Sequence, residues 1–197
     1  MSDVRLRELE GRWRQTGAVE DEAAYLMERV RVGDLTQERL VLAASCGHEG
    51  ALECLGWGRE EVSLTRSLER ALAVDERVAA RFLLEVAGGA AEASGLADPD
   101  PLRCLRATED WLADPSEPNR AAVAAAGRQA LVSSIHRSLA LTPSARAADN
   151  AAALVAHFVS KPEGRTATNV LRGALRSSNE ATLLARLRAV FVPAVIA

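Results

Sequence analysis

Aromatic residues are scarce in this 197-residue sequence, which has three tryptophans, three phenylalanines and one tyrosine. Because aromatic residues favour strands, their shortage argues against an extensive β-sheet, and no run alternates polar and apolar residues over more than a few positions. No apolar stretch approaches the roughly 20 residues that span a bilayer. The first residues, MSDVRLRELEGRW, carry charges where a signal peptide has an apolar region. We therefore expect a cytoplasmic protein with no membrane segment.

Cysteine and lysine are also rare, with three and one copies. Three unevenly spaced cysteines do not make a disulfide framework, so we expect free thiols. Alanine is the best helix former, and the chain has 38 alanines and 23 arginines. A chain of this length buries roughly 70% of the surface that it exposes when unfolded, so it needs no metal or disulfide to fold. The composition predicts one all-α domain over residues 1–197.

Apolar residues recur at helical spacing along the whole chain and predict nine or ten helices in antiparallel pairs, a helical-repeat-like arrangement of the ankyrin or HEAT kind. Thr36, Asp75 and Thr142 are predicted N-caps, and Ser177 to Glu180 resemble a capping box. The segment SGLADPDP, residues 94–101, is a possible sub-boundary, since proline, glycine and acidic residues gather there.

Three details of this prediction concern how single helices end and which way they face. We expect Gly88 and Gly89 to weaken the end of the helix that begins after Asp75. The longest helix should turn one apolar stripe inward, formed by Val123, Leu131, Ile135 and Leu139. The last helix should bury a face made of Leu183, Leu184, Leu187 and Val190.

One stretch, LVLAASCGHEGALECLG at residues 40–56, resembles the helix-turn-helix part of an ankyrin repeat. The matching positions are Leu40, Ala43, Ala44, Gly47, His48, Leu52 and Leu55. The TPLH opening of that repeat is absent, and no second copy follows at a 33-residue period. The match therefore indicates a single helical pair rather than an ankyrin array.

A longer region, residues 4–55, is similar to a short bacterial domain known as the repeat-companion domain. The residues that carry the likeness are Trp13, Glu22, Ala23, the Arg29–Gly33 turn, Glu38, Arg39, Leu40, Ala43, Ala44 and Gly47. The segment ATEDWLADPSEPNR resembles the helical extensions that accompany this domain. The resemblance implies an α-helical scaffold and assigns it no established activity.

Cys46, His48 and Cys54 form the one cluster that could carry chemistry. A structural zinc site needs four ligands, usually in paired spacings, and these three residues have irregular spacing and no obvious fourth partner. A nucleophilic Cys–His pair would also need an orienting group and an oxyanion site. We interpret His48 instead as a residue that pairs backbone groups at a turn between two helices. No catalytic residue, metal or cofactor is predicted, and an enzyme or ligand-binding bundle near Cys46 and His48 is the alternative.

Charge is distributed unevenly along the chain. Residues 1–114 carry 23 acidic and 14 basic side chains, whereas residues 115–197 carry 4 acidic and 10 basic ones. The two parts could complement each other in the fold or across an oligomer contact, or the basic part could bind a partner. The candidate partner-binding residues are Arg165, Arg172, Arg176, Arg186 and Arg188. We expect a protein-binding module, an adaptor or a neutraliser such as an immunity protein, whose partner is acidic; nucleic acid is the further alternative.

Overall fold

A computed structural model describes residues 2–137 and 142–197, and it describes side chains over 4–134 and 142–197. Every regular element in these ranges is helical, so the predicted all-α class is confirmed. The α-helices are α1 (Ser2–Thr16), α2 (Val19–Val32), α3 (Gln37–Ser45), α4 (Glu49–Leu55), α5 (Leu64–Val74), α6 (Glu76–Ala93), α7 (Pro99–Ala113), α8 (Glu117–Arg137), α9 (Pro143–Ser160), α10 (Gly164–Ser177), α11 (Glu180–Arg186) and α12 (Val192–Ile196). A 3-10 turn, η1 (Arg59–Glu61), and a π-helical turn, η2 (Leu187–Phe191), complete the set. Because α11, η2 and α12 are continuous, the described residues form eleven separate helices rather than nine or ten.

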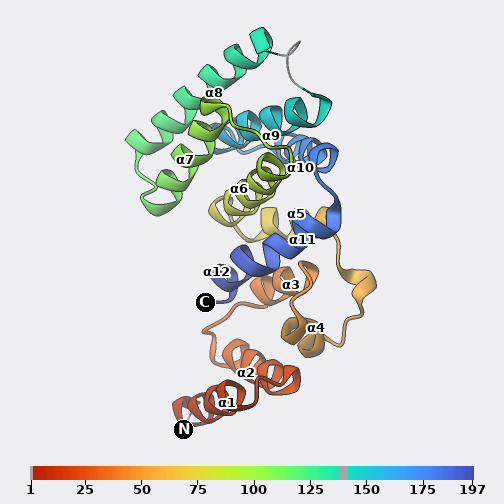
Figure 1. The fold of residues 1–197 in the computed structure, drawn as a ribbon. Coiled ribbons are helices and arrows are strands. Elements are labelled where there is room, and N and C mark those ends of the chain that lie inside the picture. Colours follow the sequence, from red (N-terminus) through yellow and green to blue (C-terminus); the bar gives the residue numbers. More distant parts are fainter. Residues whose placement is uncertain (1, 138–141) are drawn as a thin grey trace.

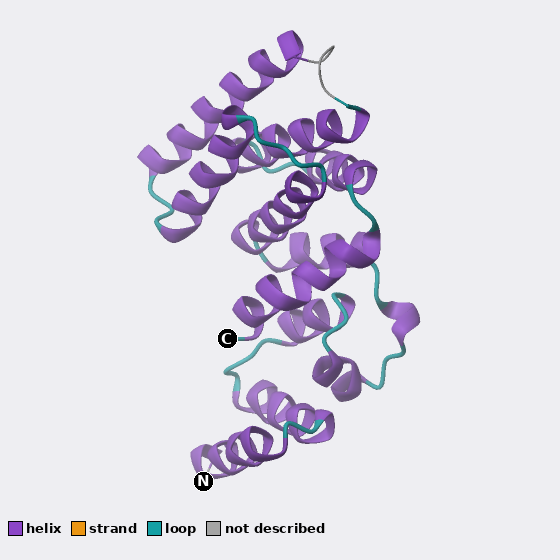
Figure 2. Cartoon of the chain, in the orientation of Figure 1, coloured by secondary structure: helices purple, strands orange, loops and turns teal. Residues whose placement is uncertain are grey.

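The helices stack into an elongated body (Figure 1). The pair α1 and α2 lies at one end, and α7, α8 and α9 lie at the other. Short loops join helices that pack as neighbouring pairs (Figure 2). The C-terminal helix, formed by α11, η2 and α12, runs back across the middle of the stack and packs on α3, α5 and α6.

Local sequence explains where several helices begin. Thr36 accepts a hydrogen bond from the Arg39 backbone N–H, Asp75 from Val78 and Thr142 from Ala145, so all three predicted N-caps are confirmed. The predicted capping box at 177–180 is wrong in one respect. Asn179 caps α11 through the Thr182 N–H, but the Glu180 carboxylate accepts a hydrogen bond of 2.9 Å from the Leu64 N–H at the start of α5. Glu180 therefore satisfies an unpaired N–H of a different helix.

Gly88 and Gly89 do not end α6, which continues to Ala93. Their lack of a side chain makes room for the C-terminal helix. A Cβ at position 89 would lie 3.0 Å from Cδ of Arg186 and 3.1 Å from Cδ2 of Leu183. The two glycines thus allow a close helix–helix contact. From the sequence we expected them only to weaken the end of the helix.

The predicted apolar face of the last helix is partly wrong. Leu183 and Leu187 are buried, but Val190 is 42% exposed and Phe191 is buried in its place. The π-helical turn η2 spans these positions. Since a π turn holds more residues than an α turn, it shifts the inward direction from position 190 to position 191.

The hydrophobic core forms one continuous cluster through the stack. Its largest fully buried side chains include Trp111, Phe82, Phe158 and Phe191. Residues 94–98 connect α6 to α7 within the predicted sub-boundary, while α6 itself packs against α9 and α10. The core thus continues past this connection as a single body.

Candidate functional site

The turn between α3 and α4 gives His48 a structural role. Gly47 adopts a left-handed conformation with φ of +88°, and the His48 N–H donates to the Ala43 carbonyl, closing the end of α3. The His48 side chain then caps α4, because its Nδ1 accepts a hydrogen bond of 3.2 Å from the Ala51 N–H. The interpretation of His48 as a turn residue is therefore confirmed.

The cysteines near this turn are poor nucleophiles. Cys46 is fully buried, and burial raises the pKa of its thiol to about 12, opposed only by hydrogen bonds with Ser67 and Ser45. Burial also raises the pKa of the half-buried Cys54 thiol. Within the described residues, no group of three His, Cys, Asp or Glu side chains is placed to hold a metal ion. The alternative of chemistry around Cys46 and His48 gains no support from this geometry.

The structure divides the five candidate arginines into separate locations. The helix α10 is continuous, so Arg165, Arg172 and Arg176 follow one another along one of its faces, and all three are exposed. None of them forms an ion pair within the part of the chain that the structure describes. We call these three residues the α10 arginine face.

Arg186 and Arg188 lie on the C-terminal helix and differ from each other. Arg186 is bound internally, since its guanidinium lies 3.2 Å from the Glu85 carboxylate and 2.7 Å from that of Glu92. Arg186 therefore links α11 to α6 by ion pairs, and its charge is not available to bind a partner as was predicted from the sequence. Arg188 is exposed and lines a small hollow beside Gly47.

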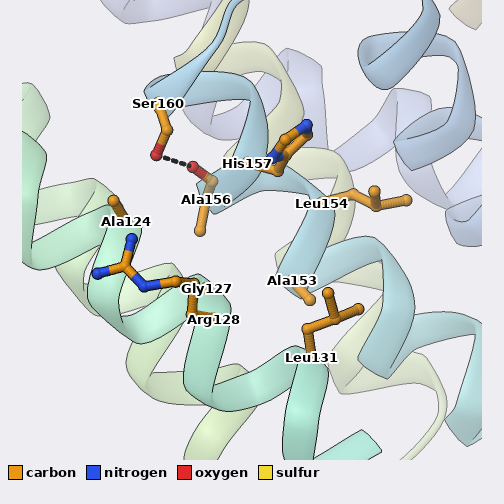
Figure 3. Close-up of a pocket in the computed structure, with 9 residues that line it drawn as sticks. All are labelled: Ala124, Gly127, Arg128, Leu131, Ala153, Leu154, Ala156, His157 and Ser160. Carbon is orange, nitrogen blue, oxygen red and sulfur yellow. Dashed lines mark hydrogen bonds between the residues drawn. The ribbon is translucent and has the colours of Figure 1, made fainter. Parts of the chain in front are cut away.

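A groove between α8 and α9 was not predicted. It has a volume of about 460 Å³, and we call it the α8–α9 groove. Its lining residues are Ala124, Gly127, Arg128, Leu131, Ala153, Leu154, Ala156, His157 and Ser160. Figure 3 shows Leu131 of α8 beside Ala153 of α9. Nearly all of the lining is apolar apart from Arg128, His157 and Ser160, and the Ser160 hydroxyl donates to the Ala156 carbonyl at 3.0 Å.

Leu131 corrects the prediction for α8. The inward stripe included it, but its side chain is 55% exposed, whereas Val123 is fully buried. The side chains of Ile135 and Leu139 lie outside the described residues. The cause is the position of α8 at the edge of the stack, where it packs mainly on α7 and α9 and leaves part of its surface open.

Small residues form the floor of the groove. A Cβ at Gly127 would lie 2.9 Å from Cβ of Ala156, so the two helices approach closely there. Beyond this contact the longer side chains of Leu131 and Leu154 stand on either side of the floor. Arg128 and His157, both exposed, add polar groups to the lining. The groove thus offers a partly covered apolar surface with a cationic edge.

No protein-family model, curated protein or solved structure matches the chain. The resemblance of residues 4–55 to the repeat-companion domain, and of 40–56 to an ankyrin helical pair, therefore stays a prediction. Among the described residues, no helix combines the length and the apolar composition that crossing a membrane requires.

Proposed function

We propose that this protein is a non-enzymatic module that binds another protein through its helices α8, α9 and α10. An adaptor and a neutraliser of a cognate protein both fit this role. The observation that carries the proposal is the α10 arginine face, Arg165, Arg172 and Arg176, whose three exposed guanidinium groups have no ion-pair partner among the described residues. Because guanidinium groups bind carboxylates in a bidentate manner, an acidic protein surface is the matching partner.

The distribution of charge supports an external partner for the basic part. Residues 115–197 carry a net charge of +6 and residues 1–114 a net charge of −9. The fold pairs some of these charges, since Arg120 meets Glu76 and Arg186 meets Glu85 and Glu92. The three residues of the α10 arginine face take no part in this pairing. Complementary charge at such a face accelerates association and fixes its orientation.

Other functions receive less support. Single-stranded nucleic acid is usually held by aromatic side chains that stack on bases between basic residues, and α10 has no aromatic residue. Nucleophilic catalysis by Cys46 at the α3–α4 turn would need a thiolate, whereas burial raises the pKa of this thiol to about 12. We place the protein in the reducing cytoplasm, where its three free cysteines are stable as thiols.

The proposal is tested by affinity capture with the full chain immobilised and an extract of its own cells as the source of partners. We expect a protein to be retained by the wild type and reduced at least about 10-fold by Arg172→Glu with Arg176→Glu. The matched control is Arg7→Glu with Arg106→Glu, which changes the charge equally at exposed arginines of α1 and α7.

Three outcomes would contradict the proposal. One is that no protein is retained. Another is that the α10 variant and the control variant retain it equally. The third is that nuclease treatment of the extract removes all retained material, which would favour nucleic acid instead.

A further inference from the structure

The outward face of α9 carries a series of residues at helical spacing. Arg146 and Asn150 are exposed, Leu154 is half-buried and His157 is exposed. These positions follow at intervals of three or four residues, so they lie along one side of the helix. They extend over 11 residues, or about 16 Å at 1.5 Å per residue. The open side of α9 is therefore about three helical turns long.

The neighbouring helices α8 and α10 pack against α9 on the two sides of this open face. On one side α10 packs against α9 where a Cβ at Gly173 would lie 3.2 Å from Cβ of Ala151. On the other side α8 packs against it at the Gly127–Ala156 contact. The outward face of α9 thus lies between a contact with α8 and a contact with α10, and we call this face, together with the hollows on its two sides, the α9 trough.

The α9 trough changes character along its length. Toward the end of α9 it includes the apolar α8–α9 groove, to which α8 contributes Leu131. Toward the start of α9 it includes a second hollow of about 450 Å³. That hollow is lined by Pro143, Arg146, Ala147, Asn150 and Arg176. The α9 trough therefore combines an apolar segment with a basic segment, and one of its basic residues, Arg176, belongs to the α10 arginine face.

Resting on the proposed function, we propose that the α9 trough seats an amphipathic helix of the partner protein. Its apolar side chains would lie against Leu131 and Leu154, and its carboxylates would pair with Arg128 and Arg176. Neither of these arginines has an ion-pair partner among the described residues, so the trough has two cationic groups free to bind carboxylates. A helix laid in a groove buries its apolar side chains at intervals of three and four residues, which suits the small and apolar lining of the α8–α9 groove.

Charge and chemistry distinguish this occupant from others. A second copy of the chain docked through the same surface would bring both copies of Arg128 and Arg176 into one interface, where like charges repel. A nucleic acid could use the arginines but would leave the apolar lining of the α8–α9 groove without a partner. An extended peptide that binds by adding a strand would need a sheet edge, and the described residues contain no strand.

The test uses a display library of random 16-residue peptides, selected on the immobilised full chain. Selected peptides are synthesised with a fluorescent label, and their affinity is measured by anisotropy. We expect apolar residues at positions i, i+3 or i+4 and i+7, accompanied by Asp or Glu, and a gain of helicity in circular dichroism on binding. Leu131→Asp and Arg128→Glu should each weaken binding at least about 10-fold.

Two matched controls separate the trough from general surface effects. Val132 is 54% exposed, follows Leu131 directly and does not line the groove, so Val132→Asp introduces the same charge on the same turn. Arg106 is exposed on α7, away from the trough, and Arg106→Glu matches Arg128→Glu. Both controls should change the affinity less than about 2-fold, because surface substitutions away from a contact have small effects.

The inference is overturned if no peptide is enriched, if the enriched peptides lack a helical apolar period, or if Leu131→Asp binds them as well as Val132→Asp does. The same four variants are then tested with the protein obtained by affinity capture. Retention that depends on Arg172 and Arg176 but not on Leu131 would refute the trough while leaving the proposed function intact. Failure to capture any protein would refute the proposed function, whatever the peptides do.

Discussion

The close approach of α8 and α9 is tested by placing a methyl group between them. Gly127→Ala should raise the helix propensity of α8 by about 0.8–1.0 kcal/mol, because glycine is unfavourable inside a helix. The new Cβ would lie 2.9 Å from Cβ of Ala156, which is fixed to the backbone of α9, so the two helices must move apart. Overpacking of this kind costs about 1–3 kcal/mol. We expect a net loss of about 1 kcal/mol in the free energy of unfolding.

Chemical unfolding measured by circular dichroism and tryptophan fluorescence provides the assay. Trp111 is buried in α7, and the guanidinium of Arg120 on α8 lies 5.0 Å from the centre of its indole ring, so its share of the emission, beside those of Trp13 and Trp57, reports on this end of the stack. In thermal unfolding, a loss of about 1 kcal/mol corresponds to a Tm lower by about 2–4 °C for a chain of this size.

Two comparisons make this result interpretable. Gly11 in α1 has no atom within 4 Å of an added Cβ, so Gly11→Ala gains helix propensity without a clash and should not lower the Tm. In the double variant Gly127→Ala with Ala156→Gly, the clash is removed, so the two substitutions should be coupled by about 1–2 kcal/mol in favour of the double variant. A Gly127→Ala protein as stable as the wild type, or additive effects in the double variant, would refute the close contact.

Three further predictions concern the α3–α4 turn, the C-terminal helix and the thiols. His48→Ala removes the cap of α4 and should lower the free energy of unfolding by about 1 kcal/mol. His48→Asn keeps a hydrogen-bond acceptor and should lower it by only about 0.3 kcal/mol. Equal losses for the two variants in denaturant titrations would refute the cap. Arg186→Ala should lower the free energy of unfolding by about 1–2 kcal/mol, because buried Glu85 then has one partner fewer. Arg188 is exposed, so Arg188→Ala should lower it by about 0.5 kcal/mol or less. A larger loss for Arg188→Ala than for Arg186→Ala would contradict the ion pairs. Burial raises the pKa of the Cys46 and Cys104 thiols to about 12, so both should react slowly with alkylating reagents. Mass spectrometry should find both unmodified after brief iodoacetamide treatment of the native protein at about pH 8. Rapid labelling of Cys46 would instead support the catalytic alternative.

Features that depend on a few consecutive residues could be predicted from the sequence. The N-caps Thr36, Asp75 and Thr142 act on an N–H three residues away, and the Gly47–His48 turn closes within six residues. The all-α class could be predicted from the alanine content, because helix propensity sums over the many residues of each helix. These properties require no knowledge of which helices become neighbours.

The candidate site could not be predicted in the same way, because it depends on which helix faces remain uncovered. Leu131 belongs to an apolar stripe, and only the edge position of α8 leaves it exposed. The α9 trough requires α8 and α10 to pack on opposite sides of α9, and Gly127 and Gly173 are the local sign of those contacts. Glycines inside alanine-rich helices were therefore the available signal of close helix packing.

The C-terminal helix shows how a regular pattern can still mislead about direction. Leu183, Leu187, Phe191 and Val195 are all buried, and they recur every four residues. In an ideal α-helix each step of four residues would rotate the side-chain direction by about 40° around the helix axis. The four side chains would then not all point to the same face. The π-helical turn at Leu187–Phe191 adds a residue to the turn and offsets this rotation. Because an ideal period of 3.6 favours Val190 over Phe191, the sequence pattern selects the wrong residue at this turn, which packs on α6.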